Sequence, residues 1–288
     1  MLSPAEEVRI LESGVGVAAP DHVDGHSAGT ALTGIPELKN VDVLFMALHG
    51  GSGEDGTLQG LLDMAGFTYT GSGRLGCAVS MDKDVSKRIL RDAGVPTPDW
   101  ITGITDPRVV VERLGLPLVV KPLSGGSTVG LTLVKDAGLV EAAAELASRF
   151  GEVMYEAFIP GRELTVGILG DEALPVGEII PEHEIFDYEC KYQPGMAQEI
   201  FPADLPSALS EKLQDLALTA HKALRLDDYS RVDFMLDGSG KAWCLEANSL
   251  PGMTSNSLLP KAAKAAGIDF PDLCHRIVRL AADRPKRP

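Results

Sequence analysis

The sequence contains no uninterrupted apolar stretch that approaches the roughly 20 residues needed to cross a bilayer. Its amino terminus also lacks the basic segment followed by an apolar one that is typical of a secretory signal. Both absences argue against a membrane partner and against export. We therefore expect a protein that stays in the cytoplasm.

Cysteine and basic residues are scarce. The cysteines Cys77, Cys190, Cys244 and Cys274 are far apart and form no CxxC or Cys/His cluster, so neither a zinc site nor a disulfide framework is predicted. Lys and Arg total 26 against 41 Asp and Glu, which gives a net charge of -15. Because clustered Lys and Arg hold a phosphate backbone, this balance argues against nucleic acid as a partner.

Strand and helix patterns alternate along the 288 residues, 44% of which are hydrophobic, and this predicts a mixed α and β fold. A buried strand is expected at 41–48 (VDVLFMAL), and two more at 116–121 and 131–134 on either side of a glycine loop at 124–130. Amphipathic spacing predicts helices at 58–65, from Asp82 to a stop at Gly94, at 139–150 and at 209–224.

Two further strands, 231–237 and 241–248, are joined by a turn composition suited to a tight hairpin. With Gly238 and Ser239 as the loop, Asp233 is predicted to lie opposite Cys244. The same register predicts Arg231 opposite Glu246. Alternation then gives one face with Arg231, Asp233, Glu246 and Asn248, and a reverse face with Val232, Phe234, Leu236 and Leu245.

The first of these faces has the oxygen ligands that magnesium prefers when phosphate oxygens complete its coordination: two carboxylates and an amide. A hairpin whose polar face meets solvent, with Arg231 paired to Glu246, is the alternative interpretation.

Lys121 ends an apolar strand directly before the glycine loop, whose backbone and hydroxyl groups, Ser127 and Thr128 among them, are suited to donate to phosphate oxygens. The loop is not a Walker A motif, because no Gly-Lys-Ser/Thr follows it. A surface hairpin turn is the alternative. Lys83 and Lys191 are further cations that, taken alone, are typical of surface lysines.

Eight motifs follow one another along the chain: ALHGGSGEDGTLQG at 47–60, YTGSG at 69–73, MDKDVSK at 81–87, VVKPLSGGSTVG at 119–130, GRELTVGILG at 161–170, FDYECKY at 186–192, RVDFMLD at 231–237 and LEANSLPGMTSNSLLP at 245–260. In this combination the chain resembles the D-alanine:D-alanine ligase family of the ATP-grasp superfamily. The resemblance covers nearly the whole chain from Val41 onward.

The resemblance implies an ATP-grasp fold with an amino-terminal Rossmann-like α/β domain. It divides the chain into a shortened substrate domain at 1–72, a central subdomain at 73–157 and a carboxyl-terminal subdomain at 158–288 that carries the magnesium and catalytic residues. ATP is expected between the last two, and a homodimer is expected to form through the first.

The resemblance also assigns roles in binding ATP and magnesium, for which manganese is a possible substitute. The phosphates are assigned to Lys83, Lys121, Ser127 and Lys191, the adenine edge and its connecting segment to Glu156, Phe158 and Ile159, and the ribose hydroxyls to Glu163. The metal ligands implied by the family are Asp233, Glu246 and Asn248, the same three that the hairpin register brings together.

In this family ATP phosphorylates one carboxylate, and the amine of a second amino acid attacks the acyl phosphate. The oxyanion of that step is assigned to Arg231 and the backbone N–H of Gly252. Ser257 is expected to meet the second substrate's carboxylate and His49 to lie near the first substrate. Tyr192 occupies the position that selects the acceptor, and a tyrosine there resembles the dipeptide-forming members.

The family's first loop supplies a glutamate for the first substrate's ammonium, and either Glu6 or Glu7 is placed to provide it. The sequence begins as though midway through that loop, without the family's first strand. Three explanations remain open: a start further upstream, a naturally reduced domain, or divergence to another substrate.

The resemblance therefore predicts an ATP-dependent D-alanine:D-alanine ligase that makes the dipeptide for peptidoglycan precursors. The alternatives are a ligase for a different amino-acid pair and a catalytically silent nucleotide-binding homologue.

Overall fold

The computed structural model describes residues 34–35, 38, 40–48, 50–103, 106–126, 128–181 and 196–285. The chain divides into two units, Met1–Val41 and Asp42–Pro288, and the second contains every element discussed below. No helix among the described residues is both long and apolar enough to cross a membrane. The predictions that lie outside the described residues concern Glu6, Glu7, His49, Ser127, Cys190, Lys191 and Tyr192.

The second unit begins with one 3-10 helix and three α-helices: η2 (Gly51–Gly53), α3 (Thr57–Ala65), α4 (Arg74–Met81) and α5 (Lys83–Asp92). The prediction of a buried strand at 41–48 is wrong. Only Leu44 pairs there, through a parallel bridge to Tyr69. Phe45 and Leu48 are exposed, because no second pairing among the described residues covers this segment.

The start of α5 is fixed by Asp82, whose side chain accepts a hydrogen bond from the backbone N–H of Val85 at 2.9 Å. Lys83 is the first residue of the helix, and Lys87 follows one turn later. Because residues four apart lie on the same side of a helix, both lysines face the same way. Both are buried, whereas charged residues on the other side of α5 are exposed.

A four-stranded antiparallel sheet follows, with the order β1-β4-β2-β3. Its strands and the helices of the same region are β1 (Trp100–Thr102), α6 (Pro107–Leu114), β2 (Leu118–Pro122), β3 (Thr132–Val134), η3 (Ala137–Leu139), α7 (Val140–Ser148) and β4 (Val153–Ala157). These elements confirm the strands predicted on both sides of the glycine loop and the helix predicted at 139–150.

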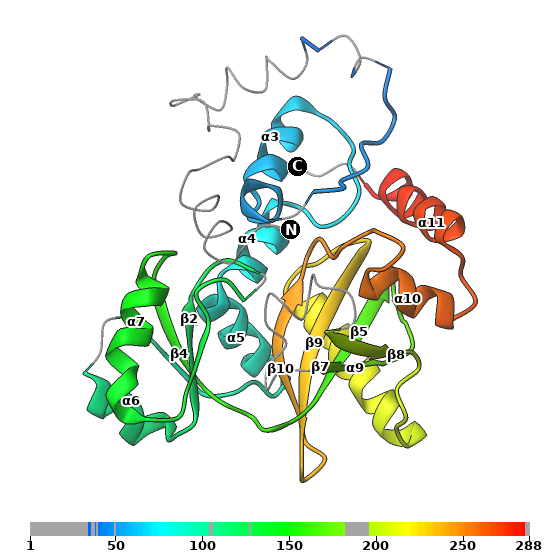
Figure 1. The fold of residues 1–288 in the computed structure, drawn as a ribbon. Helices are drawn as coiled ribbons and strands as arrows, with labels where there is room; N and C mark the ends of the chain where they lie inside the picture. Colours follow the sequence, from blue (N-terminus) through cyan, green and yellow to red (C-terminus); the bar gives the residue numbers. More distant parts are fainter. Residues whose placement is uncertain are drawn as a thin grey trace. The chain divides into compact units, whose positions relative to one another are not determined.

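Helices α6 and α7 pack on one face of this sheet (Figure 1), where Leu118, Val120 and Tyr155 join their apolar side chains in a common core. Alternation along β2 and β4 turns Lys121 and Glu156 to the opposite face. That face borders the pocket described below.

The second sheet has six antiparallel strands, with the order β10-β9-β5-β7-β8 and β6 paired to β5. Its strands and helices are β5 (Gly161–Leu169), β6 (Glu172–Ala173), β7 (Gly177–Pro181), β8 (Ala197–Ile200), α9 (Ser207–Ala223), β9 (Tyr229–Asp237), β10 (Ala242–Asn248), α10 (Leu258–Ala265) and α11 (Phe270–Asp283). The helix predicted at 209–224 is confirmed as α9.

Helix α9 packs on one face of the six-stranded sheet (Figure 1), where Val166 and Phe234 are fully buried in the same apolar cluster. On the other face α10 lies so close to β5 that a Cβ at Gly167 would meet the side chain of Leu259 at 2.6 Å. Thr165 and Asp233, which are cross-strand partners, share this second face. Arg231 and Asp233 are therefore turned away from the core beneath α9.

The register of the β9–β10 hairpin differs from the predicted one. Asp237 donates its backbone N–H to the carbonyl of Lys241 at 3.0 Å, so the loop has three residues, with Gly240 in the left-handed region at φ 80°. Cys244 pairs with Phe234 on the core face, not with Asp233.

A β-bulge then follows between Cys244 and Glu246 and makes Leu245 an extra residue on β10. Asp233 consequently pairs with Glu246, and Arg231 pairs with Asn248. The longer loop and the bulge each shift the register by one residue in the same direction, so Glu246 and Asn248 have partners two residues from the predicted ones and stay on the predicted face. Leu245, however, faces the pocket and not the apolar reverse side that was predicted.

Candidate functional site

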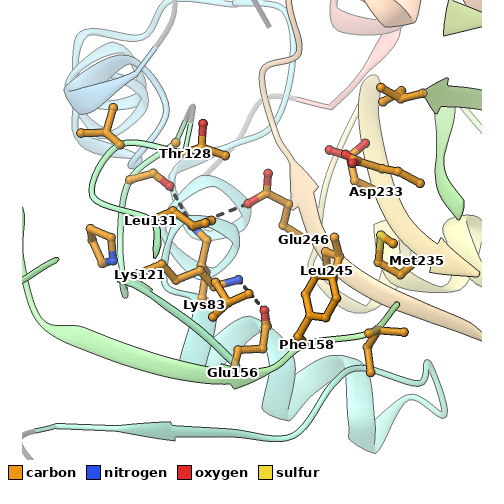
Figure 2. Close-up of a pocket in the computed structure, with 18 of the residues that line it drawn as sticks. Lys83, Lys121, Thr128, Leu131, Glu156, Phe158, Asp233, Met235, Leu245 and Glu246 are labelled. Atoms are coloured by element: carbon orange, nitrogen blue, oxygen red, sulfur yellow. Dashed lines mark hydrogen bonds and ion pairs between the residues drawn. The ribbon is translucent and has the colours of Figure 1, made fainter. Parts of the chain in front are cut away.

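A pocket lies between the two sheets, on the face of the four-stranded sheet opposite α6 and α7 and on the face of the six-stranded sheet opposite α9. Its charged lining residues are Lys83, Lys121, Glu156, Glu163, Arg231, Asp233 and Glu246. Figure 2 shows Lys121 and Glu156 pointing toward each other on one side and Glu246 pointing toward Lys83 on the other. The structure therefore brings together residues that lie up to about 160 positions apart in the sequence.

The ammonium of Lys83 lies between the glycine loop and β10. It donates a hydrogen bond to the carbonyl oxygen of Gly125 at 2.7 Å and lies 3.6 Å from Oε2 of Glu246. Burial lowers the pKa of Lys83, the charge of Lys121 acts in the same direction, and Glu246 opposes both. Lys83 is thus a cation in a poorly hydrated place, where a further anion would be stabilising.

Lys121 and Lys87 share the carboxylate of Glu156. Oε2 of Glu156 lies 2.5 Å from the Lys121 ammonium, and Oε1 lies 2.7 Å from the Lys87 ammonium. Burial by itself would raise the pKa of Glu156, but the charges and hydrogen bonds of the two lysines outweigh it and lower the pKa to about 2. Glu156 is therefore an anion at neutral pH, and its side chain is engaged by both lysines.

The carboxylate face of the hairpin is held by its neighbours. Arg231 donates from Nε to Oδ1 of Asp233 at 2.9 Å and from Nη2 to Oδ2 at 2.8 Å. Thr165 donates to Oδ1 of Asp233 at 2.7 Å, and the amide of Asn248 donates to Oδ2 at 3.0 Å. The alternative pairing of Arg231 with Glu246 is wrong, since the guanidinium forms a bidentate pair with Asp233.

This pairing also affects Arg231. Burial alone would lower the pKa of Arg231, but the adjacent Asp233 carboxylate outweighs that cost and raises the pKa above its ordinary range. Arg231 is therefore a permanent cation in the pocket wall.

The oxygen donors on the carboxylate face of the hairpin could supply part of the coordination of a hard cation. Among the described residues no group of three or more His, Cys, Asp and Glu side chains forms a complete metal site. Asp233 and Glu246 are cross-strand partners and both line the pocket, with Asn248 beside Asp233. Two carboxylates and an amide leave coordination positions open, as in magnesium sites that bind through substrate phosphates.

Apolar side chains form much of the remaining walls, and the sequence analysis assigned few of them to the site. They are Val119, Val129, Leu131, Phe158, Ile159, Ile179, Met235, Leu245 and Leu258, of which only Phe158 and Ile159 were assigned to the site. Met235 could have been found by alternation, because it follows Asp233 by two residues on β9. Leu245 could not, since the bulge turns it toward the pocket.

Gly252 and Ser257 are not among the pocket-lining residues, although Leu258, which follows Ser257, is. Ser257 is the N-cap residue of α10, and its hydroxyl oxygen accepts a hydrogen bond from the backbone N–H of Thr254 at 3.2 Å. Gly252 is buried in the segment that leads to this cap. The two residues therefore lie on the approach to α10, outside the wall of the pocket itself.

Two family models match the chain. The model described as D-ala D-ala ligase N-terminus matches residues 7–72, and the one described as D-ala D-ala ligase C-terminus matches residues 89–279. Together they leave only short segments unmatched, so the similarity extends into all three segments that were predicted to differ in role.

Individual relatives are similar over most of their length. A D-alanine–D-alanine ligase of Desulfotalea psychrophila is 45% identical over 269 residues, which is 88% of this chain and 84% of the relative. The structure of D-alanine–D-alanine ligase from Bacillus anthracis complexed with ATP superposes with a TM-score of 0.76 at 37% identity, over 87% of this chain and 82% of that one. The VanG D-Ala:D-Ser ligase from Enterococcus faecalis has the same TM-score at 34% identity, over 84% and 73%.

Proposed function

Because the chain belongs to the D-alanine–D-alanine ligase family, whose members have the ATP-grasp fold, we propose that it joins two molecules of D-alanine in an ATP-dependent reaction. The product would supply peptidoglycan precursors. One observation of the structure carries the proposal: a single pocket has buried lysines on one wall and paired carboxylates on the other. Such a pocket suits a polyphosphate held together with a divalent cation.

Within this pocket we assign the nucleotide as the family resemblance does. Lys83 and Lys121 would contact its phosphates, since both residues line the pocket. The edge of β4, at Glu156, with Phe158 and Ile159 beyond it, would receive the adenine ring among apolar walls. Glu163 at the start of β5 would accept hydrogen bonds from the ribose hydroxyls.

Magnesium, or manganese in its place, would be held by Asp233, Glu246 and Asn248. Its contribution would be to offset the negative charge of the phosphoryl groups during transfer. The residues of the chain prepare this site. Thr165 and Arg231 fix the direction of the Asp233 carboxylate by three hydrogen bonds of 2.9 Å or less. Glu246 is brought opposite Asp233 by the register after the bulge.

The chemistry then needs two steps. The carboxylate of the first D-alanine takes the γ-phosphoryl group of ATP, which leaves ADP and an acyl phosphate. The amine of the second D-alanine attacks that carbonyl carbon, and phosphate leaves. Arg231 and the backbone N–H of Gly252 would stabilise the oxyanion, a contribution of about 100-fold to 1000-fold for a single donor. Ser257 would bind the carboxylate of the second D-alanine.

Five further roles remain proposals from the family resemblance alone, because their residues lie outside the described part of the chain. These are the phosphate contacts of Ser127 and Lys191, the acceptor choice by Tyr192, the place of His49 near the first substrate, and the ammonium-binding glutamate at Glu6 or Glu7. We likewise propose the domain division 1–72, 73–157 and 158–288, a homodimer, and a cytoplasmic location, where ATP is made. Light scattering on the purified chain tests the dimer.

The proposal is tested by measuring phosphate release from ATP and magnesium with D-alanine, L-alanine or no amino acid, and by identifying the product by mass. D-alanine-dependent release with a dipeptide product is the expected result. D-serine and D-lactate are added as competing acceptors, because a D-Ala:D-Ser ligase shares the fold. Nucleotide binding without turnover on any of these substrates would contradict the ligase function and favour the silent homologue.

A further inference from the structure

One buried cation, Lys87, does not line the pocket but contacts a residue that does. Its side chain is completely buried, and its ammonium donates to Oε1 of Glu156 at 2.7 Å and to the hydroxyl of Thr97 at 2.6 Å. The ring of Trp100 lies 5.2 Å from the same ammonium. A surface lysine has no such set of partners, so the fold places Lys87 in one defined position.

The charges of Lys87, Glu156 and Lys121 together set the net charge that faces the pocket at Lys121. Glu156 gives one carboxylate oxygen to Lys87 and the other to Lys121. Two cations and one anion leave a single net positive charge, on the side where Lys121 faces the pocket. If Lys87 were neutral, the pair that remains would carry no net charge, and both carboxylate oxygens would be drawn to Lys121. Charge counts matter here because the group is poorly hydrated.

We propose that Lys87 is a positioning residue for the nucleotide phosphates: by holding one oxygen of Glu156, it keeps Lys121 in the pocket wall with an unbalanced positive charge. The inference rests on the proposed function, because it takes Lys121 to contact the phosphates of ATP. Lys87 acts only through Glu156 and Lys121.

If the role of Lys87 is purely structural, its loss has a different effect on ligand binding. Loss of a structural ion pair would weaken the fold and would reduce the binding of every ligand in the pocket. Loss of an electrostatic effect would weaken the binding of ATP, which carries phosphates. It would leave the binding of adenosine, which carries none, unchanged. The ratio of the two affinities therefore separates the interpretations.

The experiment compares the full-length wild-type chain with Lys87→Met, with the double variant Lys87→Met/Glu156→Gln, and with Thr97→Val. Calorimetric titration measures the dissociation constants of ATP with magnesium and of adenosine. We expect Lys87→Met to weaken ATP binding about tenfold relative to adenosine. The double variant removes one cation and one anion, so its net charge equals that of the wild type and the affinity ratio should return to within about twofold.

Thr97→Val is the matched control, because it removes a hydrogen bond from Lys87 without changing any charge. The ratio of its ATP affinity to its adenosine affinity should stay at the wild-type value. Equal losses of ATP and adenosine binding in Lys87→Met, or a double variant that still binds ATP weakly, would overturn the proposal. If Lys87→Met does not fold, Glu156→Gln is compared with the double variant, because these two differ only in the charge at Lys87. An ATP affinity relative to adenosine that is about tenfold higher in Glu156→Gln supports the proposal, and equal relative affinities overturn it.

Failure of this inference is distinct from failure of the proposed function. A wild-type chain that binds no ATP contradicts the ligase proposal and with it the inference. A wild-type chain that binds ATP and forms the dipeptide, together with an unchanged ratio in Lys87→Met, overturns the inference alone.

Discussion

Three carboxylates of the pocket wall each face a cation: Glu156 faces Lys121, Glu246 faces Lys83, and Asp233 faces Arg231. The Arg231–Asp233 contact of 2.8 Å is shorter than the 3.6 Å between Lys83 and Glu246. Asp233 is therefore the more firmly oriented of the two proposed carboxylate ligands. The side chain of Glu246 is more exposed than that of Asp233.

Asp233→Asn should reduce kcat/KM for ATP by about 100-fold, because an amide is a weaker ligand for a hard cation and no longer balances the charge of Arg231. Thr165→Val should reduce kcat/KM for ATP about tenfold, since it removes one hydrogen bond to the Asp233 carboxylate. Phosphate release measured against magnesium concentration checks both. The half-saturating magnesium concentration should rise in Thr165→Val. An unchanged value would remove Thr165 from the positioning of Asp233.

At the scale of elements, the β9–β10 hairpin combines two irregularities that serve the pocket. The bulge adds Leu245 to β10 without turning Glu246 away from Asp233, so an apolar side chain and a carboxylate face the pocket from neighbouring positions. A regular strand cannot do this, because successive side chains point to opposite faces. The bulge thus provides both part of the apolar wall and one proposed metal ligand.

Deletion of Leu245 tests this reading of the hairpin. The ladder would become continuous, with Cys244 opposite Phe234 and Glu246 opposite Asp233 as before. We expect ATP affinity to fall about tenfold through the loss of one apolar contact in the pocket wall, and the magnesium dependence of turnover to stay unchanged. Glu246→Gln is the comparison, since it should shift the magnesium dependence. A shift of the same size in the deletion variant would mean that the bulge is needed to direct Glu246.

At the scale of the whole molecule, His221 links α9 to β9. Its Nδ1 lies 2.7 Å from the hydroxyl of Ser230, and the side chain is buried. Burial lowers the pKa of His221 from 6.5 to about 4, although Asp227 and Asp171 oppose the shift. A neutral histidine is therefore part of the folded state, and charging it is a cost to folding.

The free energy of unfolding should consequently depend on pH. Between pH 6.5 and pH 4 the unfolded chain binds a proton that the folded chain does not, so stability is complete above this window and is lost as the pH falls through it. Between pH 7 and pH 5 the loss should be about 2 kcal/mol. Urea unfolding at both pH values should show this loss in the wild type and a smaller one in His221→Asn. The exposed His275 supplies the control: His275→Asn should behave as the wild type does.

Local patterns in the sequence were enough for several elements. The helix that begins after Asp82 and the strands around the glycine loop are formed by contacts between near neighbours, and all were predicted. The pairing of Arg231 with Asp233 on one strand and the burial of Lys87 were not predicted. The orientation of Asp233 depends on Thr165 of β5, and the burial of Lys87 depends on Glu156 of β4; no periodicity reveals either contact.

The sequence by itself determined the family and the face on which Arg231, Asp233 and Glu246 lie, because motifs and alternation are properties of short segments. Only the tertiary structure decided the hairpin register, since a three-residue loop and a bulge each move it by one position. Tertiary structure also joined Lys87, Glu156 and Lys121 into one charged group. Burial makes these charges depend on one another, and burial arises only when α5 and the four-stranded sheet pack together.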